Sequence, residues 1–300
     1  MIKNILFTGG GGVGNELIWR KLYKKYNLFF CDVEIENIDP VIPLSSKIKV
    51  CHCNSKEYIK EIKKICIKKN IDLIVPGIDE ELIKLSKNKK KLPEIFLPNQ
   101  KAIEICNNKW KTYNFCIKNK MLSPFTSLAA RFSYKHKKKV IFKPISGRGS
   151  IDIFSLDNHR ESDALISFLK IKKTIKDFIV QDFIEGTEYT VTCFINNQNN
   201  MILPYRIISK KGITKKAVFE DNHKIKNLSL QICKILNIEN IINIQLIKKN
   251  NKLYLIEINP RVSTTFCVMI FNNIDPFDKN KSKRTIIKTK LARFTKNYVF

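Results

Sequence analysis

The sequence lacks any apolar run close to the roughly 20 residues that a membrane-spanning helix needs. The first residues, 1–7, are mostly apolar, but they run directly into a glycine-rich loop. A signal peptide would need a longer apolar core and a small-residue cleavage site. Both absences exclude the usual membrane and export signals, and we expect a cytoplasmic protein with no membrane partner.

Paired cysteine spacing is also missing. The nine cysteines are scattered, and an odd number in a chain without an export signal indicates reduced thiols. Cys51-His52-Cys53 is the one local cluster, and no second pair follows at the distance that a zinc site requires. We therefore expect an ordinary strand and loop there, with no metal.

Arginine is scarce: only eight of the 55 basic residues are Arg, although the net charge is +28. A charge of that size raises nucleic acid as a partner. The lysines, however, are dispersed over helical faces such as 60–69 and 84–91, and the abundance of Lys, Ile and Asn is typical of an AT-rich genome. Nucleic-acid binding is thus a minor hypothesis, which a steep loss of DNA binding with salt would support.

What is present is a chain of 300 residues, 44% hydrophobic, which is enough for two cores. Apolar strands at 2–8, 28–32 and 72–76 alternate with helical periodicity, clearest at 56–70, and predict a small doubly wound parallel sheet. From residue 107 the pattern becomes α+β and largely antiparallel. The strands expected there are 140–144, 151–156, 178–183, 188–196, 201–208, 241–248 and 252–258, with helices at 109–120, 161–170 and 228–236.

A glycine loop follows the first strand and satisfies G-x-G-x-x-G as Gly9, Gly11 and Gly14. Asp32 ends the next strand, close to the ribose-binding position of a dinucleotide fold. Taken alone, these residues predict an NAD(P)-binding Rossmann oxidoreductase. The signal is weak, because tight strand-to-helix turns need glycine whether or not they bind phosphate. No later motif supplies a dehydrogenase-like acid and base.

A second glycine loop lies at 146–150, directly after the strand 140–144, which carries Lys143 near its end. Such a loop can close over phosphates with backbone N–H groups and an Arg. The alternative is a plain hairpin with a basic tip. The segment 179–188 is extended and can offer backbone groups to a flat base, with Glu188 placed for ribose hydroxyls. Its alternative is a strand–turn–strand with solvated acids.

Glu257 and Asn259 are two apart on a predicted strand and therefore share one face. Their neighbours are apolar, so a polar pair there is costly without a partner. Converging oxygen ligands suit Mg²⁺ held between protein and phosphates. Gln245 on an adjacent strand would complete the set, and Arg261 would clamp a phosphoryl or carboxylate oxygen. The alternative is a half-buried strand with one satisfied acid.

Residues 257–263, Glu-Ile-Asn-Pro-Arg-Val-Ser, resemble the metal-binding signature of the ATP-grasp family, especially its carbamoyl-phosphate-synthase-like and biotin-carboxylase-like branch. Further matching motifs follow the family order: 8–14, 76–82, 108–112, Lys143 with its glycine loop, 181–188 and Gln245. The resemblance implies an α/β and α+β fold. A Rossmann-like pre-ATP-grasp domain would span 1–105, and an ATP-grasp domain would span 106–300, with a small lid subdomain at about 123–184.

The resemblance also implies residue roles. Nucleotide binding would fall to Lys109, Lys143, Ser146, Gly147, Gly149, Ser150, Gln181, Asp182, Phe183, Ile184 and Glu188. The metal, Mg²⁺ or Mn²⁺, would be held by Gln245, Glu257 and Asn259. The catalytic residues would be Arg261, Lys143 and Arg206. Two positions depart from the family pattern, because Gln181 and Gln245 stand where many relatives have an acid. The carbamoyl-phosphate-synthase type itself has a Gln at the latter position.

The function implied is that of an ATP-dependent ligase, which activates a carboxylate as an acyl phosphate and transfers it to an amine or a thiol. The partners would be small-molecule carboxylates and amines, and a second copy of the chain in a homodimer. Three alternatives remain open: the oxidoreductase, a catalytically inactive ATP-binding protein, and a carboxylase-like enzyme that phosphorylates bicarbonate. The last is the less favoured because few residues follow Arg261, fewer than a biotin carboxylase needs for its C-terminal domain.

Overall fold

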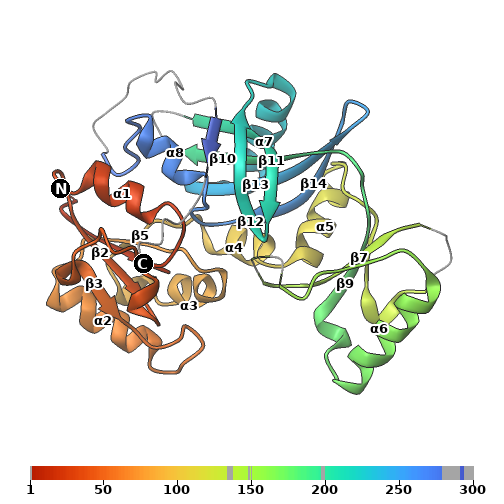
Figure 1. Cartoon of the computed structure of the whole chain (residues 1–300), viewed down its shortest axis with the longest axis horizontal. Helices are drawn as coiled ribbons and strands as arrows, with labels where there is room; N and C mark the ends of the chain where they lie inside the picture. Colours follow the sequence, from red (N-terminus) through yellow and green to blue (C-terminus); the bar gives the residue numbers. More distant parts are fainter. Residues whose placement is uncertain are drawn as a thin grey trace.

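A computed structural model describes residues 2–133, 138–147, 149, 151–196, 200–278 and 291–293. These residues form three sheets, with five, six and four strands. In Figure 1 the five-stranded N-terminal sheet lies at one end, the six-stranded sheet in the middle and the four-stranded sheet at the other end. The mixture of parallel α/β and antiparallel α+β structure confirms the predicted fold class.

The described helices are α1 (Asn15–Leu22), α2 (Tyr58–Lys68), α3 (Leu82–Lys87), α4 (Gln100–Cys106), α5 (Lys109–Lys118), α6 (His159–Ile171), α7 (His223–Ile235) and α8 (Phe266–Phe271). The strands are β1 (Asn4–Thr8), β2 (Asn27–Asp32), β3 (Lys47–Lys49), β4 (Leu73–Val75), β5 (Glu94–Ile95), β6 (Thr126–Leu128), β7 (Val140–Pro144), β8 (Phe154–Leu156), β9 (Phe178–Asp182), β10 (Thr187–Ile195), β11 (Asn200–Lys211), β12 (Ile213–Phe219), β13 (Asn240–Lys249), β14 (Lys252–Asn259) and β15 (Leu291–Arg293). The short 3₁₀ turns η1 (Ile35–Asn37) and η3 (Asp79–Glu81) also enter the argument below.

The N-terminal sheet is parallel, in the order β3-β2-β1-β4-β5. Its three central strands, β2, β1 and β4, are largely apolar, as a parallel sheet covered on both faces requires. Leu6 and Ile74 face a core formed with α2 and α3, whereas Phe7 and Val75 face a second core that includes α1 and α8. The predicted doubly wound parallel sheet is confirmed.

The first glycine loop is packed on both sides. The Gly11 N–H donates to Asp32 Oδ2 at 2.8 Å, so this carboxylate closes the loop on itself. A Cβ atom on Gly11 would lie 2.8 Å from Asn37 Cβ, and one on Gly14, whose φ is +100°, would lie 2.9 Å from Cys267 Sγ. The glycines are therefore explained by the close approach of η1 and α8 and by a left-handed backbone. This packing favours the structural reading of the motif over dinucleotide binding.

The six-stranded sheet is antiparallel, in the order β14-β13-β10-β11-β12-β15. One face packs on α7 through residues such as Val191, Ile244 and Ile232. The opposite face carries polar residues on the same strands, among them Thr190 and Asn243. The sequence did not predict β12, whose residues ITKKAVF do not alternate clearly, or α8, which is a short helix.

The four-stranded sheet, β6-β9-β7-β8, has its own small core with α6, which includes Phe142, Leu169 and Val180. The segment after β9 leads directly into β10 and so joins the small sheet to the six-stranded sheet. The domain limits 1–105, 106–300 and 123–184 stay predictions.

No helix among the described residues is long and apolar enough to cross a membrane. All nine cysteines are free thiols, and eight of them are buried. Residues 51–53 form a loop without a strand, and the described residues hold no group of three or more His, Cys, Asp or Glu side chains suited to a metal ion.

Candidate active site

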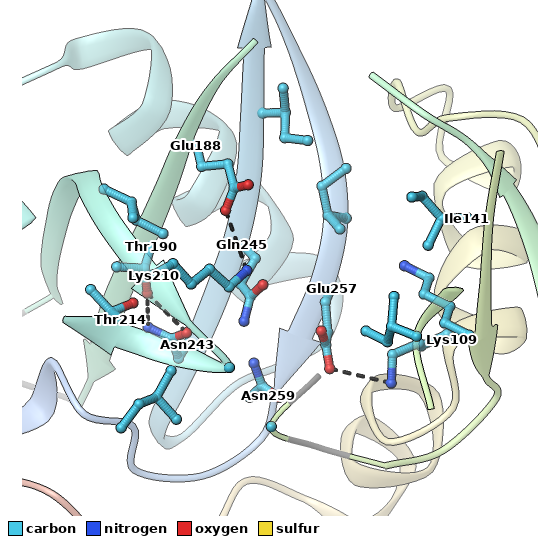
Figure 2. A pocket seen from close by; sticks show the side chains of 18 of the residues that line it. Lys109, Ile141, Glu188, Thr190, Lys210, Thr214, Asn243, Gln245, Glu257 and Asn259 are labelled. Carbon is cyan, nitrogen blue, oxygen red and sulfur yellow. Dashed lines mark hydrogen bonds and ion pairs between the residues drawn. The ribbon is translucent and has the colours of Figure 1, made fainter. Parts of the chain in front are cut away.

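A pocket of about 330 Å³ lies between the six-stranded and the four-stranded sheets. Its lining comes from β7, the β9–β10 hinge, β10, the β11–β12 hairpin, β13 and β14. Figure 2 shows polar side chains of the six-stranded sheet, among them Glu257, on the side of the pocket opposite Ile141 of β7, with Lys109 of α5 reaching toward Glu257. The volume is in the range of small-molecule sites, which are typically about 300–1,000 Å³.

One part of the pocket is lined by apolar side chains suited to a flat base. The residues that share this character are Ile141, Ile153, Ile184, Ile207, Ile247 and Ile256. They come from both sheets, so a ring placed between them would be covered on two faces. This arrangement agrees with the base-binding role predicted for the segment 181–188.

The hinge between the sheets is held by its backbone. The Asp182 N–H donates to the Phe125 carbonyl at 2.9 Å, and the Phe183 N–H donates to the Lys139 carbonyl at 3.0 Å. Both donors are therefore already used. Ile184 follows them and lines the pocket, so its backbone is the better candidate to contact a base edge.

Lys143 lies at the end of β7 and is 4% exposed. Its Nζ donates to Gln181 Oε1 at 2.8 Å, and Gln181 Nε2 donates to Thr126 Oγ1 at 2.9 Å. The pKa of Lys143 is lowered to about 8, chiefly by burial; nearby Glu257 opposes this shift, whereas Lys109 and Lys210 add to it. A buried cation whose direct partner is a neutral amide is suited to meet an anionic ligand.

Lys109 is the first residue of α5, whose N-cap Asn108 accepts the Lys111 N–H. Its Nζ donates to the Gly147 carbonyl at 3.1 Å and lies 3.4 Å from Glu257 Oε1. The helix start therefore places this lysine between the second glycine loop and β14. Gly147 and Gly149 line the pocket.

Ser146 was predicted to contact the nucleotide, but its hydroxyl is bonded to the protein backbone. Its Oγ donates to the Asn107 carbonyl at 2.9 Å, and it is not among the residues that line the pocket. The hydroxyl anchors the base of the loop instead. Ser150, also predicted to bind the nucleotide, lies outside the described residues, as does Arg148.

The predicted metal ligands lie on one face of neighbouring strands. Gln245 is paired with Glu257, and Asn243 with Asn259, across β13 and β14. A bulge leaves Ile256 without a register partner, and as a result Ile256 and Glu257, although consecutive, both line the pocket. All three ligand candidates line the pocket (Figure 2). One carboxylate and two amide oxygens fit Mg²⁺ as part of an oxygen shell that phosphates would complete.

Sequence reasoning missed a third lysine. Lys210 lines the pocket, and its Nζ lies 3.3 Å from Glu188 Oε2. The register of β11 against β12 shifts between Ile207 and Ser209 and again between Ser209 and Lys210. These bulges change which residues of β11 face the site, and no sequence pattern marks them.

A hydroxyl-rich floor was also missed. Asn243 Nδ2 donates to Thr190 Oγ1 at 2.9 Å and to Thr265 Oγ1 at 3.4 Å. Thr265 Oγ1 further lies 3.0 Å from Ser263 Oγ and 2.7 Å from Thr192 Oγ1. Uncharged side chains with ordinary strand propensity give no sequence signal for this network. It forms a rigid neutral surface beside the predicted metal ligands.

Arg261 lines the pocket but is also part of an ion pair. Its Nε lies 2.7 Å from Asp79 Oδ1, and its Nη2 lies 2.5 Å from Asp79 Oδ2. Burial alone would lower the pKa of Arg261, but Asp79, aided by Glu257 and Glu80, outweighs burial and raises it. The guanidinium is thus charged and fixed at the pocket edge, and Asp79 is a site residue that the sequence analysis did not predict.

The prediction that Arg206 faces the site is wrong. Arg206 is paired with Tyr189 on β10, whereas the pocket residue Thr190 is paired with Tyr205. Because alternate side chains of a strand point to opposite faces, Arg206 belongs to the face away from the pocket. There its Nε lies 3.4 Å from Glu220 Oε2.

Residues 106–265, more than half of the chain, match the family model of the ATP-grasp domain. Residues 18–96 match the PylC-like N-terminal domain. The chain therefore belongs to the ATP-grasp family, as the sequence motifs predicted.

Several proteins resemble this chain. A tyramine–L-glutamate ligase of Methanocaldococcus jannaschii is 27% identical over 219 residues, which cover 70% of this chain and 62% of the relative. This chain thus spans less than two thirds of that relative's length. The L-amino acid ligase of Bacillus licheniformis has a TM-score of 0.66 at 15% identity, with 89% and 69% of the two chains covered. The biotin carboxylase domain of Hydrogenobacter thermophilus 2-oxoglutarate carboxylase has a TM-score of 0.72 at 16% identity, with 92% and 68% covered. These two structures show that the fold is shared.

Proposed function

We propose that this chain is an ATP-dependent ligase that joins a carboxylate to an amine through an acyl phosphate. The observation that carries the proposal is that one pocket holds three lysines opposite a set of oxygen donors. The lysines are Lys109, Lys143 and Lys210, and the donors are Gln245, Glu257 and Asn259. Lysines can bind the phosphates, and the donors can hold a divalent cation against them.

The apolar isoleucines would cover the base, with the Ile184 backbone at its edge and Glu188 beside the ribose. Mg²⁺, when bound by Gln245, Glu257 and Asn259, would neutralise charge on the phosphate oxygens; Mn²⁺ takes similar ligands and is the alternative. Asp182 and Phe183 would keep the hinge in shape, because their N–H groups are bonded to Phe125 and Lys139.

Transfer of a phosphoryl group to a carboxylate depends on positioning and charge neutralisation rather than on covalent help from the protein. Lys143 and Lys109 would hold the phosphates, and Arg261 would stabilise charge on the reacting carboxylate. An amine would then attack the acyl phosphate carbon and release inorganic phosphate. The second glycine loop would exclude water, which would otherwise hydrolyse the intermediate.

The names of the relatives favour an amino acid as the carboxylate donor. The tyramine–L-glutamate ligase and the L-amino acid ligase are both named for amino acids. A small amine is the proposed acceptor, and a thiol is the alternative. The proposal includes a cytoplasmic location and a homodimer, the latter suggested by the dimer named for the 2-oxoglutarate carboxylase domain.

The test is ADP release by the purified chain with ATP, Mg²⁺ and single amino acids, with and without amines such as tyramine. Hydroxylamine in the assay would trap an acyl phosphate as a hydroxamate. The proposal requires ADP release that depends on the carboxylate. Tight ATP binding without such release, over the whole amino acid panel, would instead support an inactive ATP-binding protein.

A matched pair of lysine variants ties the activity to this pocket. Lys109→Met removes a pocket cation at the start of α5, whereas Lys111→Met removes an exposed lysine from the same helix. We expect Lys109→Met to lose carboxylate-dependent ADP release and Lys111→Met to keep it. Equal activity in both would place the reaction elsewhere.

A further inference from the structure

Asp79 lies in the N-terminal part of the chain, yet its carboxylate contacts a pocket residue 182 positions later. Both Oδ atoms accept hydrogen bonds from Arg261, one from Nε and one from Nη2. Asp79 is 3% exposed, and the Arg261 side chain is 14% exposed. The pair is thus bidentate and largely shielded from solvent, which makes it stronger and more directional than a surface ion pair.

This contact determines how Arg261 can be used. A guanidinium has five N–H donors in one plane. Asp79 takes two of them, and the Val262 carbonyl accepts a third, from Nη1, at 2.8 Å. Two donors remain on a residue that lines the pocket. Because the group is planar, fixing one edge fixes the direction of the remaining donors.

Asp79 is itself held rigidly. It opens the 3₁₀ turn η3, and the turn is anchored by Glu81, which is fully buried. Glu81 Oε1 accepts the Ile78 N–H at 3.1 Å and the Thr8 hydroxyl at 2.5 Å, and Glu81 Oε2 accepts the Tyr58 hydroxyl. The buried acid therefore joins β1, α2 and η3 into one support beneath Asp79.

The same turn is connected to the second glycine loop. The Asp79 carbonyl accepts Asn107 Nδ2 at 3.1 Å, and the Asn107 carbonyl accepts Ser146 Oγ at 2.9 Å. Lys109, two residues on, contacts the Gly147 carbonyl. The N-terminal turn thus contacts both the residue proposed to meet the carboxylate and the segment that anchors the loop.

We infer that Asp79 is a positioning residue for the proposed reaction, holding the Arg261 guanidinium so that its two remaining donors meet the reacting carboxylate. The inference rests on the proposed function, because it is Arg261 in that reaction that Asp79 serves. A small displacement of such a group is costly, since misplacement by about 1 Å can lower a rate by about 100-fold. A merely structural ion pair would affect stability and leave the rate per folded molecule unchanged.

The first measurement needs no catalysis. The chain has eight arginines, so the ¹⁵N-labelled protein gives few Arg Nε–H signals, and Arg261→Lys identifies the one from Arg261. We expect this proton to exchange slowly in the native chain and at least about tenfold faster in Asp79→Asn, because a charge-assisted bond has been removed. An unchanged exchange rate in folded Asp79→Asn would overturn the inference.

The control for this measurement is Asp72→Asn. Asp72 is another carboxylate of the N-terminal sheet, and its Oδ2 accepts the Lys3 and Asn4 N–H groups at 2.8 and 2.9 Å. It does not line the pocket. We expect Asp72→Asn to leave the Arg261 signal and the catalytic rate unchanged.

The second measurement is the kinetics of carboxylate-dependent ADP release. We expect Asp79→Asn to lower kcat by about tenfold or more while the KM for ATP stays near the native value. Combined with Arg261→Lys, Asp79→Asn should add little further loss, because both changes act on one group. Fully additive losses, or a native kcat in Asp79→Asn, would refute the positioning role.

Asp79→Glu is a second variant, which tests the inference even if Asp79→Asn fails to fold. It keeps the charge and moves it by one methylene, so a role in charge balance alone predicts a native kcat, whereas positioning predicts a reduced kcat. A native chain without any carboxylate-dependent ADP release would refute the proposed function instead. The exchange rate of Arg261 Nε–H would then decide by itself whether Asp79 holds Arg261.

Discussion

Lys143 is a buried cation whose surroundings are suited to an anionic ligand. Its ammonium is bonded to the neutral amide of Gln181, which Thr126 orients in turn. An acid at position 181 would hold the charge without a nucleotide. Here the charge depends more on what enters the pocket, so ligand binding and proton binding are linked.

This linkage predicts a pH dependence of nucleotide affinity. Burial lowers the pKa of Lys143 from 10.5 to about 8, so the free protein loses this positive charge as the pH rises through 8. We expect the affinity for Mg-ATP to fall between pH 8 and 10 by an amount that Lys143→Met abolishes. Titration calorimetry over this pH range measures it, and an identical pH profile in both proteins would contradict it.

The same pKa shift predicts the sign of a stability effect. Between pH 8 and 10.5 the Lys143 ammonium persists in the unfolded chain but is lost from the folded chain. The unfolded state then binds more protons, so the free energy of unfolding due to this group rises with pH over that window. Thermal melts without nucleotide should show this rise in the native chain and a smaller one in Lys143→Met.

At the scale of the element, strands were predictable where apolar residues run or alternate, as in β7, β10, β13 and β14. The prediction that Glu257 and Asn259 lie on the same face of β14 followed from the strand period alone. Lys210 could not be found in this way, because bulges in the β11–β12 hairpin alter the alternation. Arg206 was misplaced because a motif read along the sequence does not say which face a residue takes.

The face assignment on β11 can be tested directly. Lys210→Met should weaken nucleotide binding by about tenfold, or ~1.4 kcal/mol, because it removes a pocket cation. Two control variants should bind the nucleotide as the native chain does. They are Arg206→Met, on the opposite face of β11, and Lys211→Met, which changes the exposed residue next to Lys210. A loss with Arg206→Met equal to that of Lys210→Met would mean that the strand register differs from the one described.

On β14, Glu257→Gln should lower turnover by on the order of 100-fold or more, since the metal-binding charge is lost. Asn259→Ala should act in the same direction, and the two losses should not add. Glu257 also lies 3.4 Å from Lys109, so stability without nucleotide should fall in Glu257→Gln. Normal turnover in this variant, measured as ADP release, would refute the proposed metal site.

At the scale of the whole molecule, one core extends from the N-terminal sheet to the six-stranded sheet and joins these two parts. Phe96 packs against Phe194 of β10 and Phe266 of α8, with ring centroids 6.2 and 6.3 Å apart. The sequence indicated a parallel α/β pattern followed, from near residue 105, by an antiparallel α+β pattern, and its motifs identified the family. It could not show that the two parts share a core, or that Asp79 reaches Arg261, because both depend on contacts between distant segments.

The distribution of binding groups over the molecule predicts which nucleotides stabilise it. The pocket is lined by apolar side chains and lysines, whereas Asn37 and Cys267 pack closely against the first glycine loop. We expect Mg-ATP to raise the melting temperature more than NAD or NADP does, because a ligand that binds only the folded state stabilises it. A larger shift with either dinucleotide would favour the oxidoreductase.

Helix α8 has a consequence for recombining this protein with its relatives. Five of its residues are buried, from Phe266 to Ile270, and they belong to the core that also contains α1 and β1. A chimera that exchanged only the first hundred or so residues would therefore place a foreign surface against a helix that lies far along the chain, at Phe266–Phe271. Successful grafts should be those in which the segment around α8 is exchanged together with the N-terminal part.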